Sequence, residues 1–149
     1  MSAPAQPNAF VIDASIAVQL VLEEPCSPEI ETFVFERPNG ALLLAPSILA
    51  NETAAAITKK LRRKEIDLLS ARKAFSDWRQ LIADELFDLV PANNLLTAAF
   101  ELSISLHHPL HDCLYVALAQ SHKAAIVTRD VALARKARQI GIEAELISA

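Results

Sequence analysis

The chain has 149 residues, of which 52% are hydrophobic and 21% are charged, and its formal net charge is −4. A chain of this length suits one domain with one hydrophobic core. Its two glycines, Gly40 and Gly141, cannot form a glycine-rich phosphate loop, which excludes the P-loop and dinucleotide-binding classes. The acidic balance argues against binding of nucleic acid by charge alone, so a polyanionic ligand requires a cation or a local basic patch.

The sequence carries no signal for a membrane or for export. Every apolar run is interrupted well before the ~20 residues that a membrane-spanning helix needs. The first nine residues have neither the basic segment nor the apolar segment of a signal peptide. Cys26 and Cys113 lie far apart without metal-type spacing, which is typical of a reducing compartment. We therefore expect a cytoplasmic protein with no membrane partner.

In the first half of the chain, short apolar runs alternate with helical patterns. Residues 1–8 are rich in Pro, Ala and Gln and are expected to be a flexible N-terminus. The pattern then predicts a strand at 9–12, helices at 15–24 and 27–37, a strand at 41–45, a helix opened by Pro46 and Ser47 and extending to 64, and an amphipathic helix at 67–85.

The second half continues the alternation. It predicts a strand at 86–90, helices at 91–107 and 112–123, a strand at 124–128, a helix at 131–140 and a strand at 143–147. Short apolar strands that alternate with helices are typical of a parallel sheet covered on both faces. We predict an α/β fold with about five mainly parallel strands, in which helices near residues 47–85 form a protrusion.

Three aspartates lie next to predicted helix starts. Asp13 and Asp130 each follow a strand, and Asp112 opens an apolar helix. Each can be a simple N-cap, since an Asp side chain accepts hydrogen bonds from free helical N–H groups. In an open parallel sheet, however, the carboxyl ends of the strands meet at the edge where ligands bind. Asp13 and Asp130 are therefore expected to approach a common crevice.

Glu52 does not fit a capping role, because it is predicted to lie about two turns into its helix. Its helix face carries Ile48, Leu49, Ala55 and Ala56. A carboxylate among apolar neighbours needs a partner, because burial without one costs several kcal/mol or shifts its pKa. Four carboxylates in one crevice would repel each other unless a cation neutralised them, and oxygen ligands select Mg²⁺ or Mn²⁺. Such a cation can polarise a phosphodiester and prepare a water for attack.

Four motifs carry a resemblance to a known family. They are VIDAS (11–15), ANE (50–52), HDCLYVALA (111–119) and TRD (128–130). Together they resemble the PIN-domain family, and most of all the VapC-type toxin ribonucleases of bacterial type II toxin–antitoxin systems. The resemblance covers nearly the whole chain and implies a PIN-like three-layer α/β/α fold, with residues 9–149 as a single PIN domain. The family usually has Tyr or Phe in place of His111 and Ala in place of Cys113, departures that leave the carboxylates untouched.

The resemblance also implies a function. A metal-dependent endoribonuclease would hydrolyse RNA at a four-carboxylate site formed by Asp13, Glu52, Asp112 and Asp130. Asp13, Asp112 and Asp130 would ligate Mg²⁺ or Mn²⁺, directly or through water, and Ser15 and Thr128 would support them. The implied partners are a VapB-type antitoxin bound in a groove near residues 47–85, a second copy of the chain in a homodimer, and operator DNA in a larger assembly with the antitoxin.

Basic residues and histidines need a separate assessment. Residues 59–64 hold five positive charges in six positions, and Arg129 and Arg135 belong to a second basic group. Both groups are candidates for contact with RNA, and both are also explained as solvated helix ends. A last group, His107, His108, His111 and Cys113, could suggest zinc, but the segment is short and broken by a proline, which disfavours a tetrahedral site.

Competing functions make different demands on the same residues. A haloacid-dehalogenase-type domain needs a second Asp two residues after Asp13, where this chain has Ser15. A receiver domain needs paired acids at its first strand and a Lys after its last, and neither is evident. The main alternative is a non-catalytic α/β binding module whose Asp residues are only helix caps. Titration with a divalent metal separates the two, because such a module would not bind Mn²⁺ at the crevice.

Overall fold

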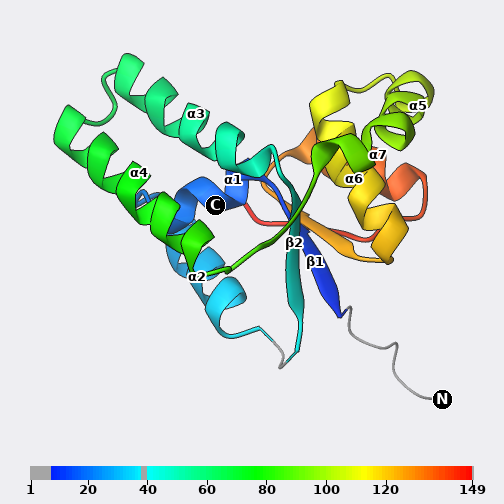
Figure 1. Cartoon of the computed structure of the whole chain (residues 1–149), viewed down its shortest axis with the longest axis horizontal. Coiled ribbons are helices and arrows are strands. Elements are labelled where there is room, and N and C mark those ends of the chain that lie inside the picture. Colours follow the sequence, from blue (N-terminus) through cyan, green and yellow to red (C-terminus); the bar gives the residue numbers. More distant parts are fainter. Residues whose placement is uncertain (1–7, 38–39, 149) are drawn as a thin grey trace.

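The computed structural model describes residues 8–37 and 40–148 (Figure 1). Five strands form one sheet in the order β3-β2-β1-β4-β5, and every neighbouring pair is parallel. The strands are β1 (Ala9–Ile12), β2 (Leu42–Pro46), β3 (Asp88–Val90), β4 (Ala125–Thr128) and β5 (Ala144–Leu146). The prediction of a parallel sheet with about five strands is confirmed. Residues 1–7 of the expected flexible N-terminus lie outside the described residues.

Helices cover both faces of this sheet. They are α1 (Ala14–Ala17), η1 (Val18–Leu20), α2 (Ser27–Phe35), α3 (Leu49–Arg62), α4 (Leu68–Ala83), η2 (Ala92–Asn94), α5 (Leu96–Leu106), α6 (Leu110–His122) and α7 (Val131–Gln139), where η marks a 3₁₀ helix. Figure 1 shows α1 to α4 on one side of the sheet and α5 to α7 on the other, with α3 and α4 projecting as a pair. The three-layer α/β/α arrangement and the helical protrusion are thus confirmed.

The handedness of the connections places the candidate site. From β1 the chain moves to β2 and then β3 in one direction across the sheet, and from β3 it returns past β1 to β4 and β5. Crossover connections between parallel strands are right-handed. The helices of connections that run in opposite directions across the sheet therefore cover opposite faces. The connection that leaves the carboxyl end of β1 therefore passes over one face of the sheet, and the connection that leaves the neighbouring β4 passes over the other. Open α/β sheets bind ligands at this kind of position, and Asp13 and Asp130 lie there.

The central strands and α6 form the core that supports this edge. Val11, Ile12, Ile126 and Val127 have no exposed surface. The run Cys113–Ala119 of α6 is buried throughout, and α6 packs on β1, β2 and β4. Burial of this central run explains why it is apolar on every side rather than amphipathic. The close packing fixes the first turn of α6 relative to the ends of the strands.

The helix predicted over 15–24 is shorter than expected. The chain leaves α1 through η1, which ends at Leu20. The hydroxyl of Ser27 lies 3.0 Å from the carbonyl oxygen of Gln19 and 3.1 Å from that of Leu22, and can donate to either. In a longer helix, backbone N–H groups would donate hydrogen bonds to such carbonyl groups. Here the Ser27 hydroxyl is the donor instead, and the helix ends early.

Two further helix starts differ from the sequence prediction. α3 begins at Leu49 because Ser47 is bound to the end of β3, where its N–H donates to Val90 O (2.7 Å) and its hydroxyl accepts from Ala92 N (3.0 Å). Glu52 therefore lies in the first turn of α3, and its expected position two turns into the helix is wrong. The helix expected over 91–107 is divided into η2 and α5.

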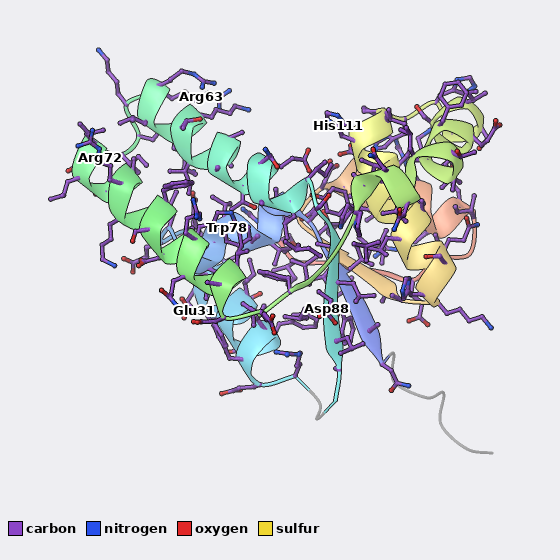
Figure 2. All side chains as sticks on the ribbon, in the orientation of Figure 1. Glu31, Arg63, Arg72, Trp78, Asp88 and His111 are labelled. Atoms are coloured by element: carbon purple, nitrogen blue, oxygen red, sulfur yellow. The ribbon has the colours of Figure 1, made fainter. Side chains whose placement is uncertain are left out.

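The α3–α4 pair is anchored at its base by one aromatic residue. Trp78 of α4 is 1% exposed (Figure 2), and its indole Nε1 donates to the carbonyl oxygen of Ala50 at 3.1 Å. The centroid of its ring also lies 5.7 Å from the ring centroid of Phe87. Trp78 thus connects α4 to the first turn of α3, two residues before Glu52.

Two simpler expectations can be compared with the structure. Cys26 and Cys113 are both buried and are not joined in a disulfide. Within residues 8–37 and 40–148, none of the helices combines the length and the hydropathy needed to cross a membrane.

We expect Trp78→Ala to lower the free energy of unfolding by about 3–5 kcal/mol, because it leaves a large cavity and removes the bond to Ala50. Phe35→Ala is the matched control, since Phe35 is 59% exposed, and we expect a loss below about 1 kcal/mol. Urea unfolding followed by circular dichroism measures both. Equal losses in the two variants would contradict the proposed anchoring role.

Candidate active site

Asp13 is the most deeply placed of the four predicted acids. It is 6% exposed and caps α1, since its Oδ1 accepts hydrogen bonds from Ile16 N (3.3 Å) and from the hydroxyl of Ser15 (2.5 Å). Its Oδ2 accepts a hydrogen bond from the hydroxyl of Thr128, at the end of β4. The capping interpretation is therefore correct for Asp13, but the carboxylate is held from β4 as well as from its own helix.

Two hydroxyl groups join the β1 and β4 ends of the site. Thr128, which has no exposed surface, donates to Asp13 and accepts from the backbone N–H of Asp130 (2.9 Å). Ser15 donates to Asp13 and accepts from the backbone N–H of Arg129 (2.9 Å). Ser15 and Thr128, the predicted supporting residues, thus contact Asp13 and lie beside Asp130.

Asp130 also acts as a helix cap. Its Oδ1 accepts from Ala132 N (2.9 Å) and Leu133 N (3.1 Å) at the start of α7. The second oxygen, Oδ2, accepts no hydrogen bond from the described residues. A carboxylate has about four acceptor positions, so capping leaves Asp130 able to bind a further group.

Asp112 is not a cap, and the capping interpretation is wrong for it. α6 begins at Leu110, with Pro109 in the N-cap position, so Asp112 lies within the first turn. Nε2 of His108 lies 3.0 Å from Oδ2 of Asp112, within ion-pair distance, and the His108 side chain is 9% exposed. Figure 2 labels the adjacent His111 at the same end of α6. Asp112 therefore lies within the first turn of its helix and beside a neighbouring imidazole, whose Nε2 makes no hydrogen bond among the described residues.

Glu52 has the partner that its apolar neighbours predict. The hydroxyl of Tyr115 donates to Oε1 of Glu52 at 2.6 Å. The sequence analysis did not single out Tyr115, although a signal was present. Tyr115 follows Asp112 by three residues, a spacing that puts both on one helix face, and its hydroxyl is a polar group within an apolar run.

The acids influence one another electrostatically. Burial raises the pKa of Asp13 to about 6, the charge of Asp130 adds to the rise, and hydrogen bonds from Ser15, Thr128 and Ile16 oppose it. Burial also raises the pKa of Asp112, against the opposing effect of His108, and Asp130 adds to the rise there too. Asp130 thus acts on both other aspartates, so the three aspartates share one region of negative potential.

The chemistry of these residues fits a hard divalent cation. Their ligand atoms are carboxylate oxygens, which Mg²⁺ and Mn²⁺ prefer. In the described part of the chain, no basic side chain forms an ion pair with Asp13, Glu52 or Asp130, so their charge has no protein counter-ion. Burying the unpaired charge of Asp13 is costly, and a cation between the carboxylates would lower that cost.

The side chains are nevertheless arranged for protein contacts in this conformation. Among residues 8–37 and 40–148, no three His, Cys, Asp or Glu side chains come together closely enough to hold a metal ion. Both oxygens of Asp13 and one oxygen of Asp130 instead accept hydrogen bonds from hydroxyl or N–H donors.

The predicted basic contacts differ in their distance from the acids. Arg129 and Arg135 belong to the segment that leaves β4 beside Asp130; Arg135 is exposed, and Nε of Arg129 is buried without a hydrogen-bond partner in the described residues. The basic run at 59–64 instead lies at the far end of α3, where Figure 2 labels Arg63 and, on α4, Arg72.

The histidine group does not form a zinc site in the described residues. His108 is directed at Asp112, and Sγ of the buried Cys113 lies 3.7 Å from the carbonyl oxygen of His108. His107 ends α5 in the left-handed conformation (φ 50°) and is exposed. The side chains thus have separate surroundings.

Comparison with known proteins identifies the family. The family model for the PIN domain matches residues 10–139, and the chain belongs to the PIN-domain family. A search of curated proteins gives no significant match. Two solved structures share the fold: PAE2754 from Pyrobaculum aerophilum (18% identity, TM-score 0.65, 91% of this chain and 83% of that chain) and FitAcB from Neisseria gonorrhoeae (12% identity, TM-score 0.64, 91% and 95%).

We expect the stability of the metal-free protein to fall as pH rises through the raised pKa of Asp13. The ordinary value of 3.8 applies to the unfolded chain and about 6 to the folded one, so folding favours the protonated acid. The stabilising effect is complete below pH 3.8 and is lost as pH rises through about 6. Asp13→Asn removes this titration and keeps the size of the side chain.

The free energy of unfolding of Asp13→Asn, relative to that of the native chain, should therefore rise by about 2 kcal/mol between pH 4 and pH 7.5. Urea unfolding in EDTA at both pH values measures it. Asp88→Asn, an exposed change at the amino end of β3, is the control and should show no such growth. A constant difference for Asp13→Asn would show that the Asp13 carboxyl titrates at its ordinary pKa.

Proposed function

We propose that this protein is a metal-dependent endoribonuclease that acts as the toxin of a toxin–antitoxin pair. The observation that most supports this proposal is the buried Asp13, which is held at the carboxyl ends of β1 and β4 in the electrostatic field of Asp130. Membership of the PIN-domain family supports nuclease chemistry, since PIN domains are generally metal-dependent nucleases. The resemblance of the four motifs to VapC-type toxins supports RNA as the substrate.

The chain's own residues would divide the work at the site. Asp13, Asp112 and Asp130 would hold Mg²⁺ or Mn²⁺, directly or through water, and Glu52 would complete the acidic group. The cation, when bound, neutralises the carboxylates and polarises a phosphodiester for hydrolysis. Ser15 and Thr128 fix the Asp13 carboxylate, and His108 lies within ion-pair distance of Asp112. The expected products carry 5′-phosphate and 3′-hydroxyl ends.

Arg129 and Arg135 are proposed as contacts for the RNA backbone. Both belong to the segment that carries Asp130, and their charge is needed because the whole chain has a formal net charge of −4. Phosphate contacts of this kind position the substrate without selecting its sequence. The site is therefore proposed to recognise the phosphodiester, and surrounding surfaces to select the RNA.

The antitoxin is proposed to bind along the α3–α4 pair. An apolar groove of about 340 Å³ lies there, lined by Ala54, Ile57, Thr58, Leu61, Leu68, Ala71, Arg72 and Phe75. Leu68 is 51% and Phe75 44% exposed, so these large apolar side chains of α4 are open to solvent at the groove. An amphipathic segment of the antitoxin would cover them.

Further assembly is part of the same proposal. The exposed α5 residues Leu96, Phe100 and Ile104 are spaced four apart and form an apolar stripe, which favours a symmetric contact between two copies of the chain. A homodimer would carry two antitoxins and, through them, bind operator DNA in the cytoplasm. The alternative, a binding module in which the aspartates are only caps, is disfavoured by Asp112, which is partly buried in the first turn of α6 without capping it.

The purified chain should cut RNA from a mixed cellular pool at discrete positions when Mn²⁺ or Mg²⁺ is present. Asp13→Asn and Asp112→Asn should lower the rate at least ~100-fold, because each removes a charge that the cation needs. Asp88→Asn should leave the rate unchanged. Sequencing of the cut ends, with an EDTA sample alongside, measures this. Unaltered cutting by folded Asp13→Asn would refute the proposed active site.

Growth inhibition by the chain should be relieved by its antitoxin, and Phe75→Asp should remain toxic when the antitoxin is present. The added charge in an apolar groove prevents an apolar segment from binding, while the active site is untouched. Phe35→Asp, at another exposed phenylalanine, should still be neutralised. Growth curves with both proteins expressed, and co-purification of the pair, test the groove. Neutralisation of Phe75→Asp would place the antitoxin elsewhere.

A further inference from the structure

We propose that Tyr115 is a positioning residue: its hydroxyl orients Glu52 at the edge of the sheet that carries the aspartates and thereby sets the affinity of the site for a divalent cation. The proposal rests on the proposed function in one respect, the presence of a metal-dependent site at these four acids. It adds a residue that touches neither RNA nor metal and acts only through Glu52.

The geometry around Tyr115 supports this role. The side chain is 1% exposed, and its hydroxyl lies 2.6 Å from Oε1 of Glu52. In the described residues, Oε2 of Glu52 accepts no hydrogen bond, so one oxygen is fixed while the other stays available. Tyr115 also lies one helical turn after Asp112 in α6, so Glu52 is bonded to the helix that carries this aspartate.

The bond matters because it connects two layers of the fold. α3, which carries Glu52, packs on α4, α1 and η1, whereas α6, which carries Tyr115, packs on α5 and on β1, β2 and β4. The two helices lie on opposite sides of the sheet (Figure 1). A direct bond between their side chains at the sheet edge therefore fixes the position of Glu52 relative to Asp112, three residues before Tyr115.

A tyrosine is chemically suited to this task. Burial and the neighbouring Glu52 raise the pKa of Tyr115, so the hydroxyl remains a proton donor at every pH at which the protein functions. A lysine or arginine in its place would bring a positive charge and compete with a cation for the carboxylates. A neutral donor orients Glu52 and leaves the negative potential of the site intact.

The test compares the native chain, Tyr115→Phe, Glu52→Gln and the double variant. Tyr115→Phe removes a single oxygen atom and keeps the ring. Calorimetry gives the dissociation constant for Mn²⁺, thermal unfolding in EDTA gives the stability, and single-turnover assays at saturating Mn²⁺ give the rate of RNA cutting. Because Tyr115 is the one tyrosine in the chain, ¹³Cζ-labelled tyrosine also gives a single assignable NMR signal.

We expect Tyr115→Phe to fold and to bind Mn²⁺ about tenfold more weakly, the effect of losing one hydrogen bond to a charged group. In the Glu52→Gln background the same change should have less than about a twofold effect, because Tyr115 then has no carboxylate to hold. The ¹³Cζ signal should move when Mg²⁺ is added to the native chain and not in Glu52→Gln.

Ser27→Ala is the matched control. It removes another buried hydroxyl, bonded to the backbone of Gln19, Leu22 and Glu24, and should lower stability without changing Mn²⁺ affinity. Native-like Mn²⁺ affinity in Tyr115→Phe, or an undiminished effect in Glu52→Gln, would overturn the positioning role alone. Mn²⁺ binding without RNA cutting would overturn the nuclease alone, and absence of Mn²⁺ binding in the native chain would overturn both.

Discussion

The carboxylate of Asp13 is the constraint around which this edge of the protein is built. It lies at the end of the central strand β1, almost without solvent, where a negative charge is costly. Hydrogen-bond donors from two places stabilise the Asp13 carboxylate: Ile16 and Ser15 in α1, and Thr128 at the end of β4. These bonds reduce the cost without removing it, as the raised pKa of Asp13 indicates. A fold that needed only stability would gain by replacing this acid with a neutral residue, so its presence points to function.

The same edge joins the two helical layers. Thr128 and Ser15 connect the β1 and β4 ends, and Tyr115 connects α6 to α3. Trp78 holds the first turn of α3 from the side of α4. The position of Glu52 is thus determined by contacts from both faces of the sheet, and the α3–α4 pair has a direct physical connection to the acids. A partner that moved the base of α3 would also move Glu52.

The sequence was most informative where local pattern decides the structure. The strands at 9–12 and 124–128 could be predicted because short apolar runs suit a sheet covered on both faces, and the parallel order then placed Asp13 and Asp130 at one edge. The starts of α3 and α6 could not be predicted in the same way. The local sequence predicts that Ser47 opens a helix, but Ser47 is hydrogen-bonded to Val90 and Ala92 at the end of the neighbouring strand. Nothing in the residues next to Ser47 indicates that contact.

Tyr115 shows the same limit at the level of a single side chain. Its partner Glu52 is 63 residues away, and only the packing of α6 on the sheet brings the two together. The sequence correctly indicated that Glu52 needs a partner, because a carboxylate beside apolar residues is costly. It could not indicate which donor the fold would supply.

The four acids come from four separate parts of the chain: the end of β1, the first turn of α3, the first turn of α6 and the end of β4. Contacts between such distant segments form late in folding, because loop-closure entropy must be overcome first. The last of these acids in chain order is Asp130, which follows β4. A growing chain therefore cannot assemble the acidic edge until β4 and Asp130 have been made, so any activity that needs all four acids begins only after that point.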